Sequence, residues 1–517
     1  MIAVLLAAAV LSGQAPQFDV LITGARVVDG SGGPWYVADV GVRGDVIVSV
    51  GRLRGASASL TLPGRGLVLS PGFIDPHTHS QNNLLSNPLA ENFVRQGVTT
   101  IIDGNDGISA YPVGAFLATL RGIKLGVNVA TFIGHGKIRE AVLGLENRKP
   151  TANELTRMRQ LTSEAMLEGA VGLSTGLFYV PGNYATTEEV ISLARVAGEL
   201  GGLHISHIRD EGDRVVESVR EAIRIGEEGD LPTQITHHKA NGYKNWGKTK
   251  DTLQLVDEAR QRGVDVTLDV YPYTAGFGPS TSLFPQWALE GGQKSLVTRL
   301  ADKDTRLRVK QGVANILREY RRPHEVVMAR CPQEPELEGK TLAQVTESGG
   351  AAPTVENAAE TALRIQEKGG CWDIWYMMEE SDVERVLRRP ETMIGSDGAP
   401  GDYILHPRSY GTFVRILGTF VRDRKVLTLE EAVRRMSALP ANRFGFRDRG
   451  LIRPGMKADL VLFNPVTVAD KSTYERPKQH PEGVSHVLVN GRLVIRDGIP
   501  TNERPGVVLY GPAHGRP

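Results

Sequence analysis

Short apolar runs alternate with longer amphipathic stretches through the middle of this chain. The runs have the length of buried strands and lie at residues 73–79, 99–104, 127–133, 170–175, 202–207, 232–237, 264–270 and 393–397. Between them, apolar residues recur with a helical period, as at residues 154–168, 187–200, 214–228 and 249–262. Strand–helix alternation is typical of a parallel sheet. Eight repeats predict an α/β fold with a (β/α)8 barrel of the TIM type.

Both ends of the chain have a different pattern, with short alternating strands separated by glycines. This pattern covers residues 18–67 and occurs again at residues 458–463 and 487–494. We therefore expect a small β-sandwich domain built from both chain ends, residues 16–69 and 450–517, which brackets a barrel at residues 70–449.

A long gap separates the seventh apolar run from the eighth, from residue 271 to about residue 392. Such a gap is far longer than an ordinary loop, and it contains helical patterns of its own at residues 304–320 and 355–367. The pattern predicts a subdomain inserted between barrel strands 7 and 8, at about residues 278–390, over the mouth of the barrel.

The first eleven residues form an apolar run that is too short to span a bilayer but fits the core of a signal peptide. Small residues follow it, so residues 1–15 are predicted to be a signal peptide and the protein to be periplasmic or secreted. Two features do not fit: no basic residue precedes the run, and Pro16 follows the expected cut. The alternative is an apolar first strand of a cytoplasmic protein.

The composition is that of a globular protein, with 517 residues of which 41% are hydrophobic and 23% charged. The net charge is +1, which gives no reason to expect binding to nucleic acid or to an anionic membrane. The expected partner is a small molecule, and the oligomeric state is left open. The two cysteines, Cys331 and Cys371, either form one disulfide or remain two buried thiols.

Polar residues that can bind a metal fall at the ends of the predicted strands. His77 and His79 are two residues apart at the end of the first run and point to the same face. His207, His237 and Asp397 end the fifth, sixth and eighth runs. Because chemistry in such barrels lies at the carboxyl ends of the strands, these side chains should converge. Imidazole and carboxylate ligands suit Zn²⁺ or another borderline divalent ion.

Seven segments together resemble the amidohydrolase superfamily, and most closely its N-acyl-D-amino-acid deacylase (D-aminoacylase) branch. They are PGFIDPHTH at 71–79, GNDGIS at 104–109, GLSTGL at 172–177, HIR at 207–209, HHK at 237–239, DVYPY at 269–273 and GSDG at 395–398. The resemblance covers nearly the whole chain after about residue 17. It implies a metal-dependent barrel joined to a small β domain made from both chain ends.

The resemblance also implies roles for individual residues. The positions that match metal ligands are His77, His79, His207, His237 and Asp397. Those that match residues holding a substrate carboxylate are Lys239, Tyr271 and Arg408, a set that suits this anion chemically.

One position departs from the family. Where the family usually has a metal-bridging cysteine, this chain has Asp106. Other branches use a carboxylated lysine at the end of the fourth strand, but here the residues are Ser174, Thr175 and Gly176. Asp106 is then either the bridge between two metal ions, or a sign that one ion binds firmly and a second weakly.

The resemblance implies hydrolysis of the amide bond of N-acyl-D-amino acids, or of dipeptides with a C-terminal D-residue, by metal-activated water, with Asp397 as general acid and base. The D preference comes from the family alone. The alternatives are a hydantoinase-like or isoaspartyl-dipeptidase-like hydrolase and a non-catalytic carboxylate-binding relative.

Asp75 is expected either to orient a histidine or to be a buried structural group. Aromatic residues of the insertion are expected either to pack its core or to line the pocket, namely Phe277, Phe284 and Trp287.

Overall fold

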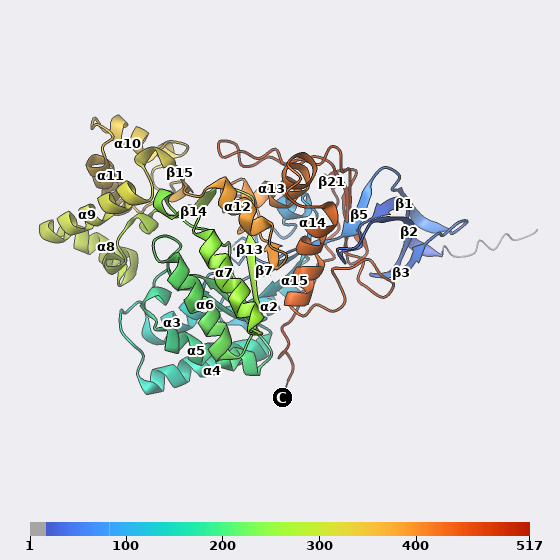
Figure 1. The fold of residues 1–517 in the computed structure, drawn as a ribbon, viewed down its shortest axis with the longest axis horizontal. Helices are drawn as coiled ribbons and strands as arrows, with labels where there is room; N and C mark the ends of the chain where they lie inside the picture. Colours follow the sequence, from blue (N-terminus) through green and yellow to red (C-terminus); the bar gives the residue numbers. More distant parts are fainter. Residues whose placement is uncertain (1–16, 82, 517) are drawn as a thin grey trace, which may run out of the picture.

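A small sheet domain, a barrel and an inserted subdomain follow one another along the length of the molecule (Figure 1). The structure is a computed structural model that describes residues 17–81 and 83–516. The predicted signal peptide, residues 1–15, lies outside the described residues.

The barrel consists of eight parallel strand positions, and each overlaps one of the eight apolar runs. In order around the wall they are β6 (Phe73–Asp75), β7 (Val98–Asp103), β8 (Asn128–Thr131) continued by β9 (Ile133–Gly134), β10 (Gly172–Gly176), β11 (Leu203–His207), β12 (Thr233–Ile235), β13 (Val266–Val270) and β17 (Thr392–Ile394). A parallel bridge between Thr78 and Gly398 joins the first position to the last. The prediction of a (β/α)8 barrel is confirmed.

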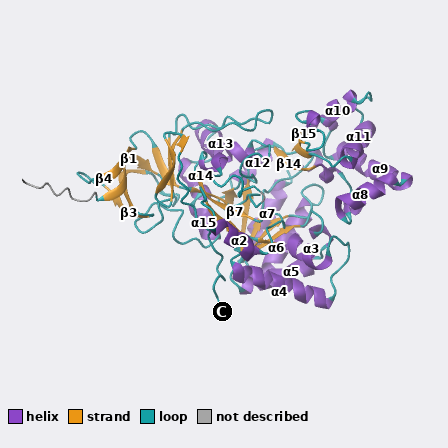
Figure 2. Ribbon diagram, turned by 180° about the vertical axis from the view of Figure 1, so that it is seen from behind, coloured by secondary structure: helices purple, strands orange, loops and turns teal. Residues whose placement is uncertain are grey.

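Helices surround these strands, as Figure 2 shows. They are α1 (Glu91–Val94), α2 (Val113–Arg121), α3 (His135–Leu143), α4 (Ala152–Glu168), α5 (Thr187–Glu199), α6 (Val215–Gly229), α7 (Thr249–Gln261), α12 (Glu380–Leu387), α13 (Arg408–Arg415), α14 (Leu429–Met436) and α15 (Ala438–Arg443). Local sequence fixes where some of them begin. Thr151 caps α4 in a reciprocal capping box with Glu154. No helix in the described part of the chain is long and apolar enough to cross a membrane.

Strands from both chain ends form one sheet beside the barrel. The N-terminal strands are β1 (Phe18–Val27), β2 (Tyr36–Arg43), β3 (Val46–Gly51), β4 (Ala58–Pro63) and β5 (Val68–Pro71), and the C-terminal strands are β18 (Leu460–Phe463), β19 (Val484–Val489), β20 (Arg492–Arg496) and β21 (Ile499–Pro500). The two groups meet where β5 pairs antiparallel with β18, with Leu69 opposite Leu462. After Gly72 the chain passes directly from β5 into barrel strand β6.

The last residues leave this sheet and return to the barrel. Val508 forms a parallel bridge with Val129 of β8, and the Gly511 amide donates to the Gly169 carbonyl. The expected β domain at residues 450–517 therefore includes a tail that packs on the barrel, where the Val129 amide of β8 donates to the Val507 carbonyl and the Leu509 amide donates to the Val129 carbonyl.

The inserted subdomain has its own sheet and core. Its elements are β14 (Ala275–Pro279), α8 (Gly292–Ala301), α9 (Lys303–Glu319), β15 (Val326–Arg330), α10 (Leu342–Ser348), α11 (Val355–Glu367) and β16 (Trp372–Tyr376). Apolar residues from its helices and strands form a separate buried cluster. The next helix, α12, packs on α7 and β13 of the barrel. The insertion thus spans β14 to β16, and its C-terminal end precedes the expected boundary near residue 390.

Candidate metal centre

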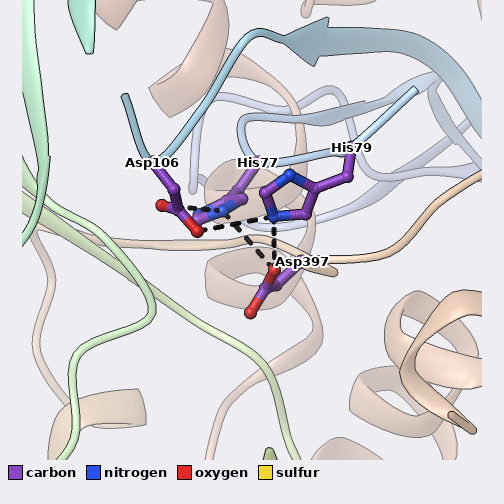
Figure 3. Close-up of side chains that lie close together, drawn as sticks. All are labelled: His77, His79, Asp106 and Asp397. Atoms are coloured by element: carbon purple, nitrogen blue, oxygen red, sulfur yellow. Dashed lines mark hydrogen bonds and ion pairs between the residues drawn. The ribbon is translucent and has the colours of Figure 1, made fainter. Parts of the chain in front are cut away.

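The first and eighth strand positions bring two histidines and an aspartate together at the mouth of the barrel. The chain continues beyond β6 and β17, where the His79 amide donates to the Gly398 carbonyl and the Asp397 amide donates to the His77 carbonyl. This backbone pairing sets the Asp397 carboxylate beside both imidazoles (Figure 3). Its Oδ1 lies 3.0 Å from His79 Nε2 and 3.6 Å from His77 Nε2.

Asp106 reaches the same point from the turn that follows β7. Left-handed backbone at Gly104, Asp106 and Gly107 forms this turn, and aspartate tolerates that conformation better than most residues. Ser174 of β10 supports the turn, because its Oγ donates to the Gly104 carbonyl and accepts from the Gly107 amide. The fourth strand therefore supports Asp106 at the place where other branches of the superfamily supply a lysine.

Two clusters of donor atoms share the Asp106 carboxylate. Each cluster has ligand atoms within 4.8 Å of one another: His77, His79, Asp106 and Asp397 form one, and Asp106, His207 and His237 form the other. Asp106 lies 3.4 to 3.6 Å from a ring nitrogen of each of the four histidines. Ligands held about 2.0–2.1 Å from a tetrahedral zinc lie roughly 3.3 Å from one another. The spacing therefore suits one ion in each cluster, with Asp106 between them.

Unpaired polar atoms support the fit to a metal. His77 Nε2, Asp106 Oδ1 and His207 Nδ1 are buried and have no hydrogen-bond partner among the described residues. Buried polar atoms are nearly always paired, and the chemistry of this donor set is that of zinc ligands. Asp106, His237 and Asp397 also have positive φ angles of 56°, 32° and 52°, strain of the kind that is concentrated at functional sites.

The charges of the centre favour ionised carboxylates. Burial opposes the charge of Asp106, but His77 and His237 hold the pKa of its carboxyl well below the usual range. Burial likewise opposes the charge of Asp397, but Arg408 and His77 hold its pKa below the usual range. Both side chains are therefore acceptors at neutral pH.

Two acidic side chains lie behind the histidines. Asp269 Oδ1 is 3.5 Å from His77 Nδ1 without a hydrogen bond to it and accepts from the His237 amide instead. Glu211 Oε1 lies closer to its histidine, 3.1 Å from His237 Nδ1. Such outer partners fix the orientation of ligating imidazoles. Glu211 was not among the predicted residues; its position four residues after His207 is the only signal in the sequence.

Asp75 is a buried structural group, which is the second of the two roles expected for it. Its Oδ1 accepts hydrogen bonds from the backbone amides of His77 and Ser396, at 3.1 and 3.0 Å. It is a fully buried structural group that ties the first strand position to the last, and its contacts are with backbone and not with a ring nitrogen.

The three residues expected to hold a carboxylate lie together beside the centre, but two of them already have acidic partners. Arg408 Nη1 lies 2.7 Å from Asp397 Oδ2, and Lys239 Nζ lies 2.5 Å from Glu211 Oε1. The Tyr271 hydroxyl is buried and has no partner among the described residues. The ring centre of Tyr271 lies 5.0 Å from Arg408 Cζ and 5.8 Å from Lys239 Nζ.

The centre opens into a cavity of about 350 Å³ between the barrel mouth and the inserted subdomain. Phe277 and Phe284 line it. Phe284 also packs in the core cluster of the insertion, so both expectations hold for that residue. Trp287 does not: it is 39% exposed and lies against Arg308 instead.

Residues 65–495 match the Amidohydrolase family. The chain belongs to this family. The amidohydrolase is 38% identical to a D-aminoacylase of Alcaligenes xylosoxydans xylosoxydans over 95% of its own length and 97% of that protein. The resemblance inferred from the seven segments is confirmed.

Solved structures agree with this assignment. The amidohydrolase superposes with a TM-score of 0.83 on N-acyl-D-glutamate deacylase from Bordetella bronchiseptica, which was solved with zinc and a phosphonate mimic of the tetrahedral intermediate. The two are 35% identical over 95% of this chain and 99% of the other. A D-hydantoinase, 15% identical with a TM-score of 0.58 over 95% of this chain and 98% of the other, shares the fold alone.

Proposed function

We propose that this amidohydrolase uses zinc to hydrolyse the amide bond of N-acyl-D-amino acids. The observation that carries the proposal is the pair of donor clusters joined by Asp106, which opens into a cavity that Lys239, Tyr271 and Arg408 also line. The D-aminoacylase and the N-acyl-D-glutamate deacylase named above support the substrate class.

The proposed zinc ligands are the residues of the two clusters. They are His77, His79, Asp106 and Asp397 on one side and Asp106, His207 and His237 on the other. Zinc held there would supply Lewis-acid chemistry, since it lowers the pKa of a bound water to about 7 and polarises a carbonyl oxygen. One or two ions suit this donor set.

Asp397 is the proposed general base and acid. Its Oδ1 faces the histidine pair while Arg408 holds Oδ2, so the carboxylate is fixed in direction. Because its pKa lies below the usual range, Asp397 is ionised at neutral pH and can take a proton from the attacking water. The protonated Asp397 side chain can then pass that proton to the departing amine.

The free carboxylate of the substrate is proposed to bind between Lys239, Tyr271 and Arg408. The Tyr271 hydroxyl is a donor without a partner among the described residues. Lys239 Nζ already lies within hydrogen-bond distance of Glu211, the His237 carbonyl and His237 Nδ1, so it contributes its charge rather than a free N–H. Arg408 Nε is also buried and has no hydrogen-bond partner in residues 17–81 and 83–516. Donors therefore remain for an anion, even though both cations already have acidic partners.

A substrate panel tests the proposed function. Zinc-loaded protein should hydrolyse N-acetyl-D-amino acids with a kcat/KM at least about 100-fold above that for the L-enantiomers. Hydantoins and β-aspartyl dipeptides serve as the comparison. If only these are hydrolysed, the hydantoinase-like or isoaspartyl-dipeptidase-like alternative holds. Stoichiometric zinc without turnover of any amide would support a non-catalytic carboxylate-binding protein.

We propose that the protein is exported. Cys331 and Cys371 form a disulfide within the inserted subdomain, and disulfides persist in oxidising compartments. The apolar N-terminal run supports the same conclusion. Fractionation of the native host should place the protein outside the cytoplasm, without residues 1–15; full-length protein in the cytoplasm would refute export.

Loss of the disulfide should destabilise the inserted subdomain. The bond links residues 40 positions apart, and closing such a loop stabilises the folded state by about 4 kcal/mol in the chain-entropy model. Cys331→Ser should lower the free energy of unfolding by that amount in urea, followed by tryptophan fluorescence. Reduced wild type and the Cys331→Ser/Cys371→Ser double variant are the controls, and both should match the single variant. An unchanged midpoint in reductant would show that no bond forms.

A further inference from the structure

One cation in the wall of the cavity forms no ion pair within the described part of the chain. Three lysine or arginine side chains line the cavity: Lys239, Arg408 and Arg321. Lys239 is paired with Glu211 and Arg408 with Asp397. Arg321, just beyond α9, forms no ion pair with any carboxylate of residues 17–81 and 83–516, although it is only 8% exposed.

The contacts of Arg321 leave most of its donors free. Nη1 donates to the Ser282 carbonyl at 3.3 Å, and Nη2 lies 4.0 Å from Met377 Sδ. Nε is buried and has no partner among the described residues. The guanidinium lies over the ring of Trp375, with Cζ 4.4 Å from the ring centre. This stacking holds the group in a fixed direction but does not neutralise its charge.

Two acidic groups act on Arg321 without forming an ion pair with it. Glu211, which is paired with Lys239, has the larger effect on the pKa of Arg321, and Asp373 has the smaller. Asp373 is on β16, two residues before Trp375; it is fully buried, and neither of its carboxyl oxygens has a hydrogen-bond partner among the described residues. Burial raises the pKa of Asp373 to about 8, although the Arg321 charge acts in the opposite direction. Burial lowers the pKa of Arg321 to about 10, so at pH 7 the arginine is charged and the aspartate is largely neutral.

A buried charge without a counter-charge is costly, and proteins keep such groups mainly where function needs them. Arg321 lines the same cavity as the metal cluster, on the side formed by the insertion together with Ser282 and Trp375. The proposed binding residues for the α-carboxylate come from the barrel. A substrate bound at the centre could therefore meet cations at two separate points.

We propose that Arg321 binds a second carboxylate of the substrate, so that the amidohydrolase prefers dicarboxylate substrates over neutral ones. The second carboxylate can belong to an acidic D-amino-acid side chain or to a dicarboxylic acyl group. This inference rests on the proposed function and adds the substrate class to it.

Pairs of charged and neutral isosteres test the proposal. N-acetyl-D-glutamate is compared with N-acetyl-D-glutamine, and N-succinyl-D-leucine with N-succinamoyl-D-leucine. A charged hydrogen bond should raise kcat/KM for the acid over its amide by about 10- to 100-fold in one of the two pairs. The pair that shows the preference identifies whether the side chain or the acyl group meets Arg321.

Variants separate recognition from a structural role. Arg321→Gln should bring the acid-to-amide ratio close to one, and Arg321→Lys should keep part of the preference. Arg322→Gln, a change at the exposed neighbouring arginine, should leave the ratio as in the wild type. If Arg321→Gln does not fold, the Arg321→Lys ratio decides the question, together with calorimetric binding of N-acetyl-D-glutamate and N-acetyl-D-glutamine to zinc-loaded Asp397→Asn, in which hydrolysis is slow.

The outcomes also separate this inference from the proposed function. Equal turnover of acids and amides, or an Arg321→Gln variant that slows every substrate equally, would overturn the role of Arg321 and leave the deacylase proposal standing. If no N-acyl-D-amino acid is hydrolysed, the deacylase proposal fails. Tighter binding of N-acetyl-D-glutamate than of N-acetyl-D-glutamine, lost in Arg321→Gln, would still support the anion subsite; equal binding would refute it.

Discussion

Asp397→Asn should lower kcat for N-acyl-D-amino acid hydrolysis by about 10²- to 10⁴-fold, the usual contribution of a general acid–base group. An amide cannot take a proton from water at neutral pH, whereas the carboxylate is held ionised beside His77, His79 and Arg408. Asparagine has a similar volume and tolerates the backbone φ of 52° at this position, so the fold should be retained. Steady-state kinetics with parallel zinc analysis is the measurement.

The matched control for this prediction is Asp402→Asn. Asp402 lies outside the cavity lining and pairs with Lys478 at 2.7 Å, so its loss should leave kcat within about threefold of the wild type. Retention of wild-type turnover by Asp397→Asn with zinc bound would remove Asp397 from the proton-transfer role. A parallel loss of zinc and activity would instead make it chiefly a ligand.

Asp106→Asn should weaken zinc binding by at least about 10- to 100-fold, the loss that removal of even an outer partner of a metal ligand causes. Asp106 is the carboxylate shared by both clusters, and the amide removes its charge while keeping its size and its tolerance of a φ of 56°. Zinc content after dialysis, together with a competition titration against a chelator, measures the effect. Unchanged stoichiometry and affinity would exclude Asp106 as a ligand.

A second variant, Asp106→Cys, tests whether a thiolate at this position binds zinc better than the carboxylate. Thiolate is a softer zinc ligand than carboxylate, although cysteine accepts the left-handed backbone less well than aspartate. Higher zinc content or rate in this variant would show that Asp106 replaces a cysteine at a bridging position. Circular dichroism should show the same fold for both variants.

Much of the barrel could be predicted from the sequence because its signals are local. Apolar periodicity located all eight strand positions, and the helix expected at residues 187–200 is α5 (Thr187–Glu199). The sequence was less informative about which domain each helix packs against. The amphipathic pattern of α12 does not show whether it belongs to the insertion or to the barrel, and only its contact with α7 and β13 decides.

The candidate centre could be predicted in part for the same reason. Parallel strands end at one face of a barrel, so the histidines and Asp397 had to point to a common region. Ser174 also lies near a strand end, but nothing in the sequence shows that it supports the Asp106 turn, and Glu211 and Arg321 do not lie at strand ends. Their importance lies in contacts with Gly104, His237 and the cavity, and none of these contacts follows from spacing along the chain.

The sequence by itself determined the strand–helix order, the residues at the strand ends and the family, because periodicity and motifs are properties of neighbouring residues. Only the tertiary structure decided which charges are paired. Lys239 and Arg408 each form an ion pair, whereas Arg321 forms none with the residues that the structure describes, although all three side chains are cations. Electrostatic interaction depends on distance and burial in space, and residues far apart in the chain set both.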